Sequence, residues 1–166
     1  MIALFLALTL LVGCGSGNKA AVRADGSKYQ VACLIDDGVT AAMLPDTVNQ
    51  YRQVASWMEN DLVRLLTRAG YQVRPIQSRS DYAAAPGSYL LQARITNYNP
   101  GSKAARMLVG FGAGATSLDI EYQIINGQGQ QLYSKADGIG SGRDWTFCCR
   151  ALNERMVSML GTQIGL

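Results

Sequence analysis

One amphipathic stripe constrains the fold of this chain more than any other feature. Between Pro45 and Gly70, apolar side chains recur at spacings of three and four residues, which is the repeat of one helix face. Thr47 and Gln50 stand in capping-box positions at the start, and Gly70 supplies the left-handed residue that follows many helix C-termini. The sequence therefore predicts one long helix with a single face to bury. Its apolar members are Val48, Tyr51, Val54, Ala55, Met58, Leu62, Leu65, Leu66 and Ala69.

Five β-rich runs accompany that helix. The first is apolar on both faces, which predicts a central strand. The third and fourth alternate apolar and polar residues, which is typical of strands with one buried face. Asn126–Gly129 is a hairpin signal between the last two runs, and Gly138–Gly142 is predicted to loosen the chain after them. The runs are residues 29–35, 71–74, 89–98, 116–124 and 131–136.

A second amphipathic helix is predicted at the C-terminus, where Leu152, Met156, Val157, Leu160 and Ile164 form one face. The resulting order is β-α-β-β-β-β-α. It predicts an α+β fold, with a mainly antiparallel sheet of about five strands and both helices on one face. Residues 29–166 are long enough for one domain.

The N-terminus resembles a bacterial lipoprotein signal peptide. From Ile2 to Val12 every residue except Thr9 is apolar, a run too short to span a bilayer but suited to a signal-peptide core. The run ends in a lipobox-like Leu11–Cys14. No Lys or Arg precedes Lys19, whereas such a leader normally opens with one. The alternative is a buried N-terminal element with an incidental Cys14.

If the leader is genuine, residues 1–13 are the signal peptide and residues 14–28 are a lipidated Cys14 with a flexible tether. Two acyl chains and an amide-linked third anchor a protein firmly. Gly15 follows the cysteine, instead of the aspartate that retains lipoproteins of enteric type in the inner membrane. We therefore expect the periplasmic face of the outer membrane, and favour the inner membrane less.

Composition excludes several classes of function. The net charge is +3, with scattered Lys and Arg, which argues against nucleic-acid binding but permits attraction to anionic lipid headgroups. The sequence has no histidine. Histidine-based acid–base catalysis and most zinc sites are therefore excluded. No cofactor or metal is predicted.

The remaining cysteines are Cys33, Cys148 and Cys149. In an oxidising compartment Cys33 can pair with either of the other two. Cys33 can equally be a small buried hydrophobe, and the sequence leaves both interpretations open. A redox or metal role for the Cys148–Cys149 pair is disfavoured because no third ligand type lies nearby in sequence.

Two further motifs are candidate sites. Gly110–Gly114 is rich in glycine, but a strand follows it where a dinucleotide fingerprint needs a helix. A bulge or a close backbone approach is the preferred explanation. Asp36-Asp37-Gly38 is predicted to be a turn; the alternatives are a ligand for a hard cation and a catalytic carboxylate. Among the aromatic residues, we expect Trp57 at the rim of the core, and Trp145 and Phe147 buried against the sheet.

The segment from Arg106 to Tyr122, RMLVGFGAGATSLDIEY, resembles the bacterial lipoprotein family catalogued as domain of unknown function 4410. That family has an arginine-led apolar step, alternating glycines, a strand, a return strand and a C-terminal helix. The resemblance extends over Val31–Ile164 and implies a localisation and a fold. It implies no catalytic residue, because the family has no assigned activity.

The sequence therefore predicts a non-enzymatic, membrane-anchored periplasmic lipoprotein that binds or scaffolds another envelope protein or a second copy of itself. The alternative is a binder of a small apolar or lipid ligand between sheet and helices, and a third hypothesis is a hydrolase that uses Asp36 or Asp37. An exposed apolar segment rich in glycine suits partner docking. The candidate partner-binding residues are Arg106, Met107, Leu108, Val109 and Phe111.

Overall fold

The computed structural model describes residues 28–102 and 114–165. Their order of elements confirms the predicted α+β class, with one short 3-10 turn in addition. The elements are β1 (Gln30–Asp36), α1 (Pro45–Arg68), β2 (Gln72–Pro75), η2 (Arg79–Asp81), β3 (Ser88–Asn99), β4 (Thr116–Asn126), β5 (Gln131–Ser141) and α3 (Trp145–Gln163).

The five strands form one mixed sheet in the order β2-β1-β3-β4-β5. β1 is central, as expected, but pairs in parallel with both β2 and β3, whereas β3, β4 and β5 are antiparallel. The prediction of a mainly antiparallel sheet is therefore wrong in this detail. Parallel neighbours need long crossover connections. Here α1 is the crossover between β1 and β2, and residues 76–87 carry the chain across β1 to β3.

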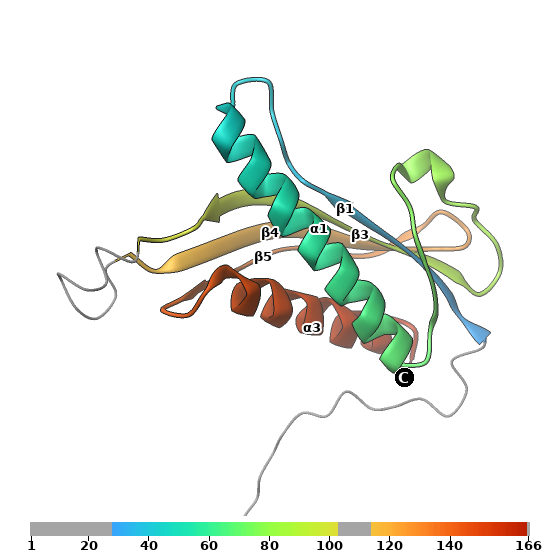
Figure 1. Cartoon of the computed structure of the whole chain (residues 1–166). Helices are drawn as coiled ribbons and strands as arrows, with labels where there is room; N and C mark the ends of the chain where they lie inside the picture. Colours follow the sequence, from blue (N-terminus) through green and yellow to red (C-terminus); the bar gives the residue numbers. More distant parts are fainter. Residues whose placement is uncertain (1–27, 103–113, 166) are drawn as a thin grey trace, which may run out of the picture.

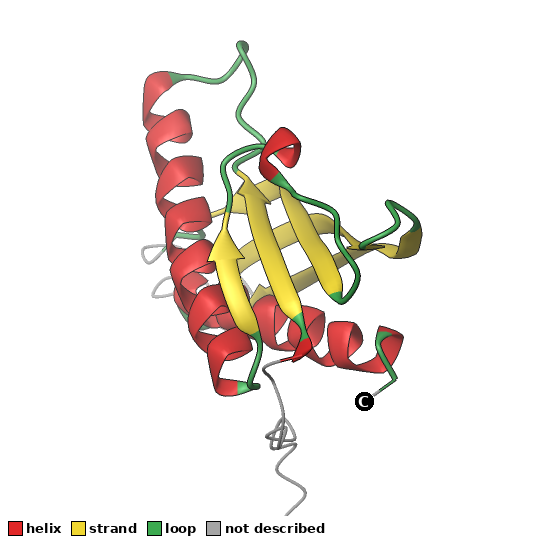
Figure 2. Ribbon diagram, turned by 90° about the vertical axis from the view of Figure 1, so that its right-hand side faces the viewer, coloured by secondary structure: helices red, strands yellow, loops and turns green. Residues whose placement is uncertain are grey.

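Both helices cover one face of the sheet (Figures 1 and 2). α1 packs over β1 and β2, and α3 packs over β4 and β5. The core between the layers is dense: Met58 and Leu62 of α1, and Leu152 and Met156 of α3, are fully buried. The inward faces predicted for the third and fourth runs are confirmed by their buried residues. These are Leu91, Ala93, Ile95, Leu118, Ile120, Tyr122 and Ile124.

The other face of the sheet is only partly covered. Ile76 and Tyr82, from the segment that crosses β1, pack on a small cluster that includes Leu34 and Leu90. Beyond this cluster, polar side chains pair across β3 and β4, as in the hydrogen bond from Gln123 to Gln92 at 3.1 Å. This face is therefore largely polar and carries no second helical layer among the described residues.

Some of the local sequence signals for helix ends and loops are confirmed, and others are wrong. The capping box of Thr47 and Gln50 is not formed, because α1 begins directly at Pro45 and no side chain caps it. At the other end, Gly70 has the left-handed conformation expected of it, with φ of 88°. β5 does not loosen at Gly138 but continues to Ser141. Pairing with β4 holds it straight, since Ile139 lies opposite the fully buried Leu118.

Within residues 28–102 and 114–165, no helix combines the length and the apolar composition needed to cross a bilayer.

Candidate functional site

Three predicted sites lie outside the part of the chain that the structure describes. The first is the lipidation residue Cys14. The second is the glycine-rich motif Gly110–Gly114, of which only Gly114 is described. The third is the candidate partner-binding set, which is Arg106, Met107, Leu108, Val109 and Phe111.

The three described cysteines are free and buried. Burial raises the pKa of Cys33 and of Cys149 to about 12, and also raises the pKa of Cys148. All three thiols are therefore neutral and poorly nucleophilic at physiological pH. The candidate disulfide from Cys33 to the pair is not formed in this structure. Cys33 instead belongs to the main core cluster, as the buried-hydrophobe interpretation predicted.

Asp36 and Asp37 form the predicted turn at the carboxyl end of β1. Asp36 Oδ1 accepts a hydrogen bond from the Gly38 N–H at 2.8 Å, and Asp37 Oδ1 accepts one from the Val39 N–H at 3.0 Å. Both carboxylates line an open cleft of about 640 Å³. Arg52 faces Asp37 there at 3.8 Å.

The cleft suits a polar solute better than a covalent reaction. The hydroxyl of Ser78, on its lining, shares a hydrogen bond with the Ser80 hydroxyl at 2.8 Å, and only the Ser78 backbone N–H donates to a carboxylate, that of Asp81. Glu59 also lines the cleft, yet the described residues contain no group of three His, Cys, Asp or Glu side chains that could hold a metal ion. The described lining therefore presents charged groups without an assembled nucleophile and base.

A second, shallower hollow lies where the start of α3 meets α1. Its volume is about 470 Å³. We call it the aromatic–arginine hollow, and its lining residues are Trp57, Arg143, Asp144, Thr146, Phe147 and Arg150. Sequence reasoning expected Trp57 at the rim of the core, and the structure places it at the edge of this hollow.

Aromatic rings and guanidinium groups contact one another around the hollow. Trp57 and Trp145 meet edge to face, with ring centroids 5.9 Å apart. The Arg150 guanidinium lies 5.7 Å from the centroid of Trp57, and that of Arg143 lies 4.6 Å from Phe147. Trp145 and Phe147 are only partly buried, so the full burial predicted for them is not observed. Trp145 packs against the edge of the main core cluster and on Trp57 of α1.

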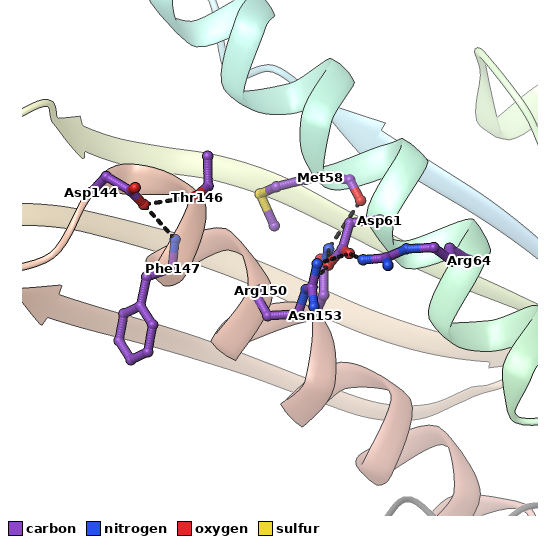
Figure 3. Close-up of polar contacts among 8 residues, drawn as sticks. All are labelled: Met58, Asp61, Arg64, Asp144, Thr146, Phe147, Arg150 and Asn153. Atoms are coloured by element: carbon purple, nitrogen blue, oxygen red, sulfur yellow. Dashed lines mark hydrogen bonds and ion pairs between the residues drawn. The ribbon is translucent and has the colours of Figure 1, made fainter.

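A buried carboxylate beneath the hollow joins the two helices (Figure 3). Asp61 of α1 is only 4% exposed, and it accepts hydrogen bonds from Arg150 Nε at 2.9 Å and Asn153 Nδ2 at 3.1 Å. It also forms an ion pair with Arg64. Asn153 Nδ2 donates to the Met58 carbonyl as well, at 3.0 Å. The Asp61 network therefore fixes Arg150, and with it one wall of the hollow.

Asp144 orders the opposite wall by capping α3. Its Oδ1 accepts hydrogen bonds from the Thr146 hydroxyl at 2.6 Å and from the Phe147 N–H at 3.1 Å (Figure 3). These two bonds hold the pKa of Asp144 below its usual value. Because the carboxylate stays ionised, it also interacts favourably with the positive, N-terminal end of the α3 helix dipole.

Sequence reasoning missed the Asp61 network. None of its four polar side chains was predicted to be part of a site. They are Asp61 and Arg64 of α1, and Arg150 and Asn153 of α3. One signal was available: Asp61 and Asn153 each stand directly beside a stripe leucine, Leu62 and Leu152. A polar residue at the border of two facing stripes is a candidate for a hydrogen bond between the helices.

A match to a known family shows to which family the chain belongs. A family model described as Domain of unknown function (DUF4410) matches residues 16–142. The chain belongs to this family. The resemblance expected from Arg106–Tyr122 is thereby confirmed. The DUF4410 match ends before α3, so the α3 side of the aromatic–arginine hollow lies beyond the matched residues.

Solved structures give only distant likenesses to this DUF4410 chain. A dodecamer of a PelC variant from Paraburkholderia phytofirmans has 12% identity and a TM-score of 0.45, covering 86% of this chain and 90% of that one. A homologue of neuraminyllactose-binding hemagglutinin from Helicobacter pylori has 11% identity and a TM-score of 0.42, covering 90% and 88%. No curated protein matches the chain significantly. Likenesses of this size carry no functional inference.

Proposed function

We propose that this DUF4410 chain is a lipid-anchored, non-enzymatic binding domain on the periplasmic face of the bacterial outer membrane. It docks another protein of the cell envelope through the aromatic–arginine hollow. The observation that carries this proposal is the hollow itself, where aromatic rings and arginines gather and the buried Asp61 holds Arg150 in place.

The residue types of the hollow are those that dominate protein interfaces. Trp, Tyr and Arg are enriched among the residues whose removal costs most binding energy, and interface cores are rich in aromatic residues. The Arg150 side chain is already held by Asp61, and the backbone at Phe147 by the cap at Asp144. Binding therefore need not order Arg150, which lowers its entropic cost.

The charges of the hollow indicate the chemistry of the partner. Arg150 is paired with the buried Asp61, which also pairs with Arg64. Arg64, Arg143 and Arg150 therefore outnumber the two carboxylates, Asp61 and Asp144, in and beneath the hollow, so the rim favours acidic groups. The rings of Trp57 and Phe147 favour an apolar side chain between them. We therefore expect a protein surface with an apolar or aromatic anchor flanked by Asp or Glu.

The alternative of an apolar ligand between sheet and helices gains no support from the described residues. That space is filled by fully buried side chains such as Met58, Leu118 and Met156. The segment Arg106–Phe111 stays a sequence-based candidate for an additional contact.

Two surface variants test the docking proposal. Phe147→Ala removes an aromatic contact, and Arg143→Glu reverses a rim charge. We expect each to weaken by tenfold or more the recovery of an envelope protein captured by the tagged wild-type chain from solubilised envelopes, because hot-spot losses exceed about 1.4 kcal/mol. The measurement is quantitative mass spectrometry of the captured protein.

Leu44→Ala is the matched control. Leu44 is 73% exposed and lies at the start of α1, outside the hollow, so its loss removes surface apolar area without touching the hollow. Undiminished capture by both hollow variants, with unchanged circular dichroism, would contradict the docking proposal.

Cys14→Ala tests the anchoring proposal separately. Without the thiol no acyl chain can be attached, so we expect an uncleaved precursor that lacks lipid. Metabolic labelling with a palmitate analogue and intact mass measurement report both effects. Labelling of the variant at the wild-type level would rule out Cys14 as the anchor.

A further inference from the structure

The two edges of the sheet differ sharply. β2, at one edge, has four residues and ends in Pro75, and short strands and prolines both discourage further pairing. β5, at the other edge, has eleven residues. Within the described residues no strand lies on its outer side. A long edge of this kind is a template for another strand.

The backbone of Gly138 shows which β5 residues face the open edge. Its N–H donates to Asp137 Oδ1 at 2.9 Å, and its carbonyl accepts from Arg155 Nη1 at 3.4 Å. These groups are thus turned away from β4. A second strand would replace the Asp137 bond to the Gly138 N–H, whereas the Gly138 carbonyl can accept a second donor beside Arg155. Because the direction alternates along an antiparallel strand, Ser134, Ala136 and Gly138 present their N–H and C=O groups outward.

The side chains of β5 are complementary to themselves about Ala136. Lys135 and Asp137 lie on the helix-covered face, because their β4 partners Tyr122 and Ile120 are buried there. Within one chain, Asp137 Oδ1 is held by Arg155 at 3.0 Å and Asp137 Oδ2 by Lys135 at 3.4 Å. If two copies of β5 pair antiparallel with Ala136 opposite Ala136, each Lys135 lies opposite Asp137 of the second copy and can exchange its contact to that copy's Oδ2, while Arg155 keeps Oδ1. Such cross-strand pairs of opposite charge stabilise a sheet.

The same register satisfies the remaining requirements of strand pairing. Ser134, Ala136 and Gly138 have small side chains or none. The sheet face away from the helices therefore meets no steric obstacle at the junction. Tyr133 comes opposite Ile139, which is a favourable aromatic and β-branched pair. Registers moved by two residues along either strand place Lys135 and Asp137 away from each other.

We propose that β5 is a self-association edge, through which two copies of this chain join as an isologous dimer with one continuous sheet. The occupant of the edge is the β5 strand of the second copy, in antiparallel register centred on Ala136. Charge complementarity between Lys135 and Asp137 selects this register. A symmetric interface of this type uses the same surface on both copies.

Cysteine crosslinking tests the register directly. In hydrogen-bonded antiparallel pairs, opposite Cα atoms lie about 5.5 Å apart, which is within the range of about 4.4–6.8 Å that a disulfide spans. Ala136→Cys in the full-length chain, in isolated envelopes under oxidation, should form a disulfide-linked dimer on non-reducing electrophoresis. Ser134→Cys is the control, because its two copies would lie about 13 Å apart along the paired strands.

Charge variants give a second, independent readout. In a dimer of the Lys135→Asp variant, an acidic side chain at position 135 faces Asp137 of the second copy. In a dimer of the Asp137→Lys variant, Lys135 faces a basic side chain at position 137. Asp137→Lys also removes the ion pair with Arg155, so circular dichroism first establishes that this variant is folded. Each variant should lose crosslinking at position 136, and a mixture of the two should regain it as a heterodimer. Crosslinking from Ser134→Cys as strong as from Ala136→Cys, or none from Ala136→Cys in a folded chain, would overturn the proposal.

Discussion

Asp61→Ala should lower the free energy of unfolding by about 3 kcal/mol, since breaking a buried ion pair costs about 3–5 kcal/mol. The lower end applies because Arg150 and Arg64 are 36% and 43% exposed and can regain water once the carboxylate is gone. Asn153 keeps its hydrogen bond to the Met58 carbonyl. Chemical denaturation monitored by tryptophan fluorescence measures the change.

Arg64→Ala is the control for this prediction. Its guanidinium is close to half exposed, and Asp61 keeps Arg150 and Asn153 as partners when Arg64 is removed. We therefore expect a loss of at most about 1 kcal/mol, as for an exposed pair. Asp61→Ala should also weaken partner capture, because Arg150 loses the contact that fixes it beside Trp57. Equal destabilisation by both variants would mean that Asp61 does not hold the helices together.

Gly38→Ala should destabilise the chain by at least about 2 kcal/mol, for two reasons. Gly38 has φ of 69°, where a side chain costs roughly 1–2 kcal/mol. In addition, an added Cβ would lie 1.9 Å from the carbonyl oxygen of Ile95. Because that oxygen belongs to the backbone of β3, the turn that carries Asp36 and Asp37 must move. Thermal unfolding measures the loss.

Gly129→Ala separates the two contributions. Gly129 has φ of 79° but no atom within 4 Å of an added Cβ, so its replacement should cost only the conformational part of about 1 kcal/mol. The difference between the two variants measures the close approach of Gly38 to β3. Equal losses would show that this approach is not tight in solution.

The sequence predicts the elements well because their signals are local. The apolar stripe of α1, its end at Gly70 and the alternation in β4 depend on neighbours within a few residues, and all three are present. The strand directions are not local. Whether β1 pairs in parallel depends on the direction from which the chain returns to the sheet after α1. The residues of β1 themselves do not indicate that direction.

The candidate sites were harder to predict for a similar reason. The aromatic–arginine hollow joins Trp57 to Arg150 across two helices that are distant in sequence. Its buried anchor, Asp61, resembles an ordinary solvated residue until α3 packs against it. The edge of β5 was obscured by its glycines, which suggested a loop at Gly138, whereas pairing with β4 keeps the strand intact.

The most direct test of docking through the hollow is photo-crosslinking in intact cells. A photo-activatable amino acid replaces Thr146, which lines the hollow, or Ser158, which is exposed about three turns further along α3. We predict one discrete adduct with an envelope protein from position 146, reduced by Phe147→Ala and absent from position 158. No adduct from position 146, or the same adduct from both positions, would contradict the proposed function.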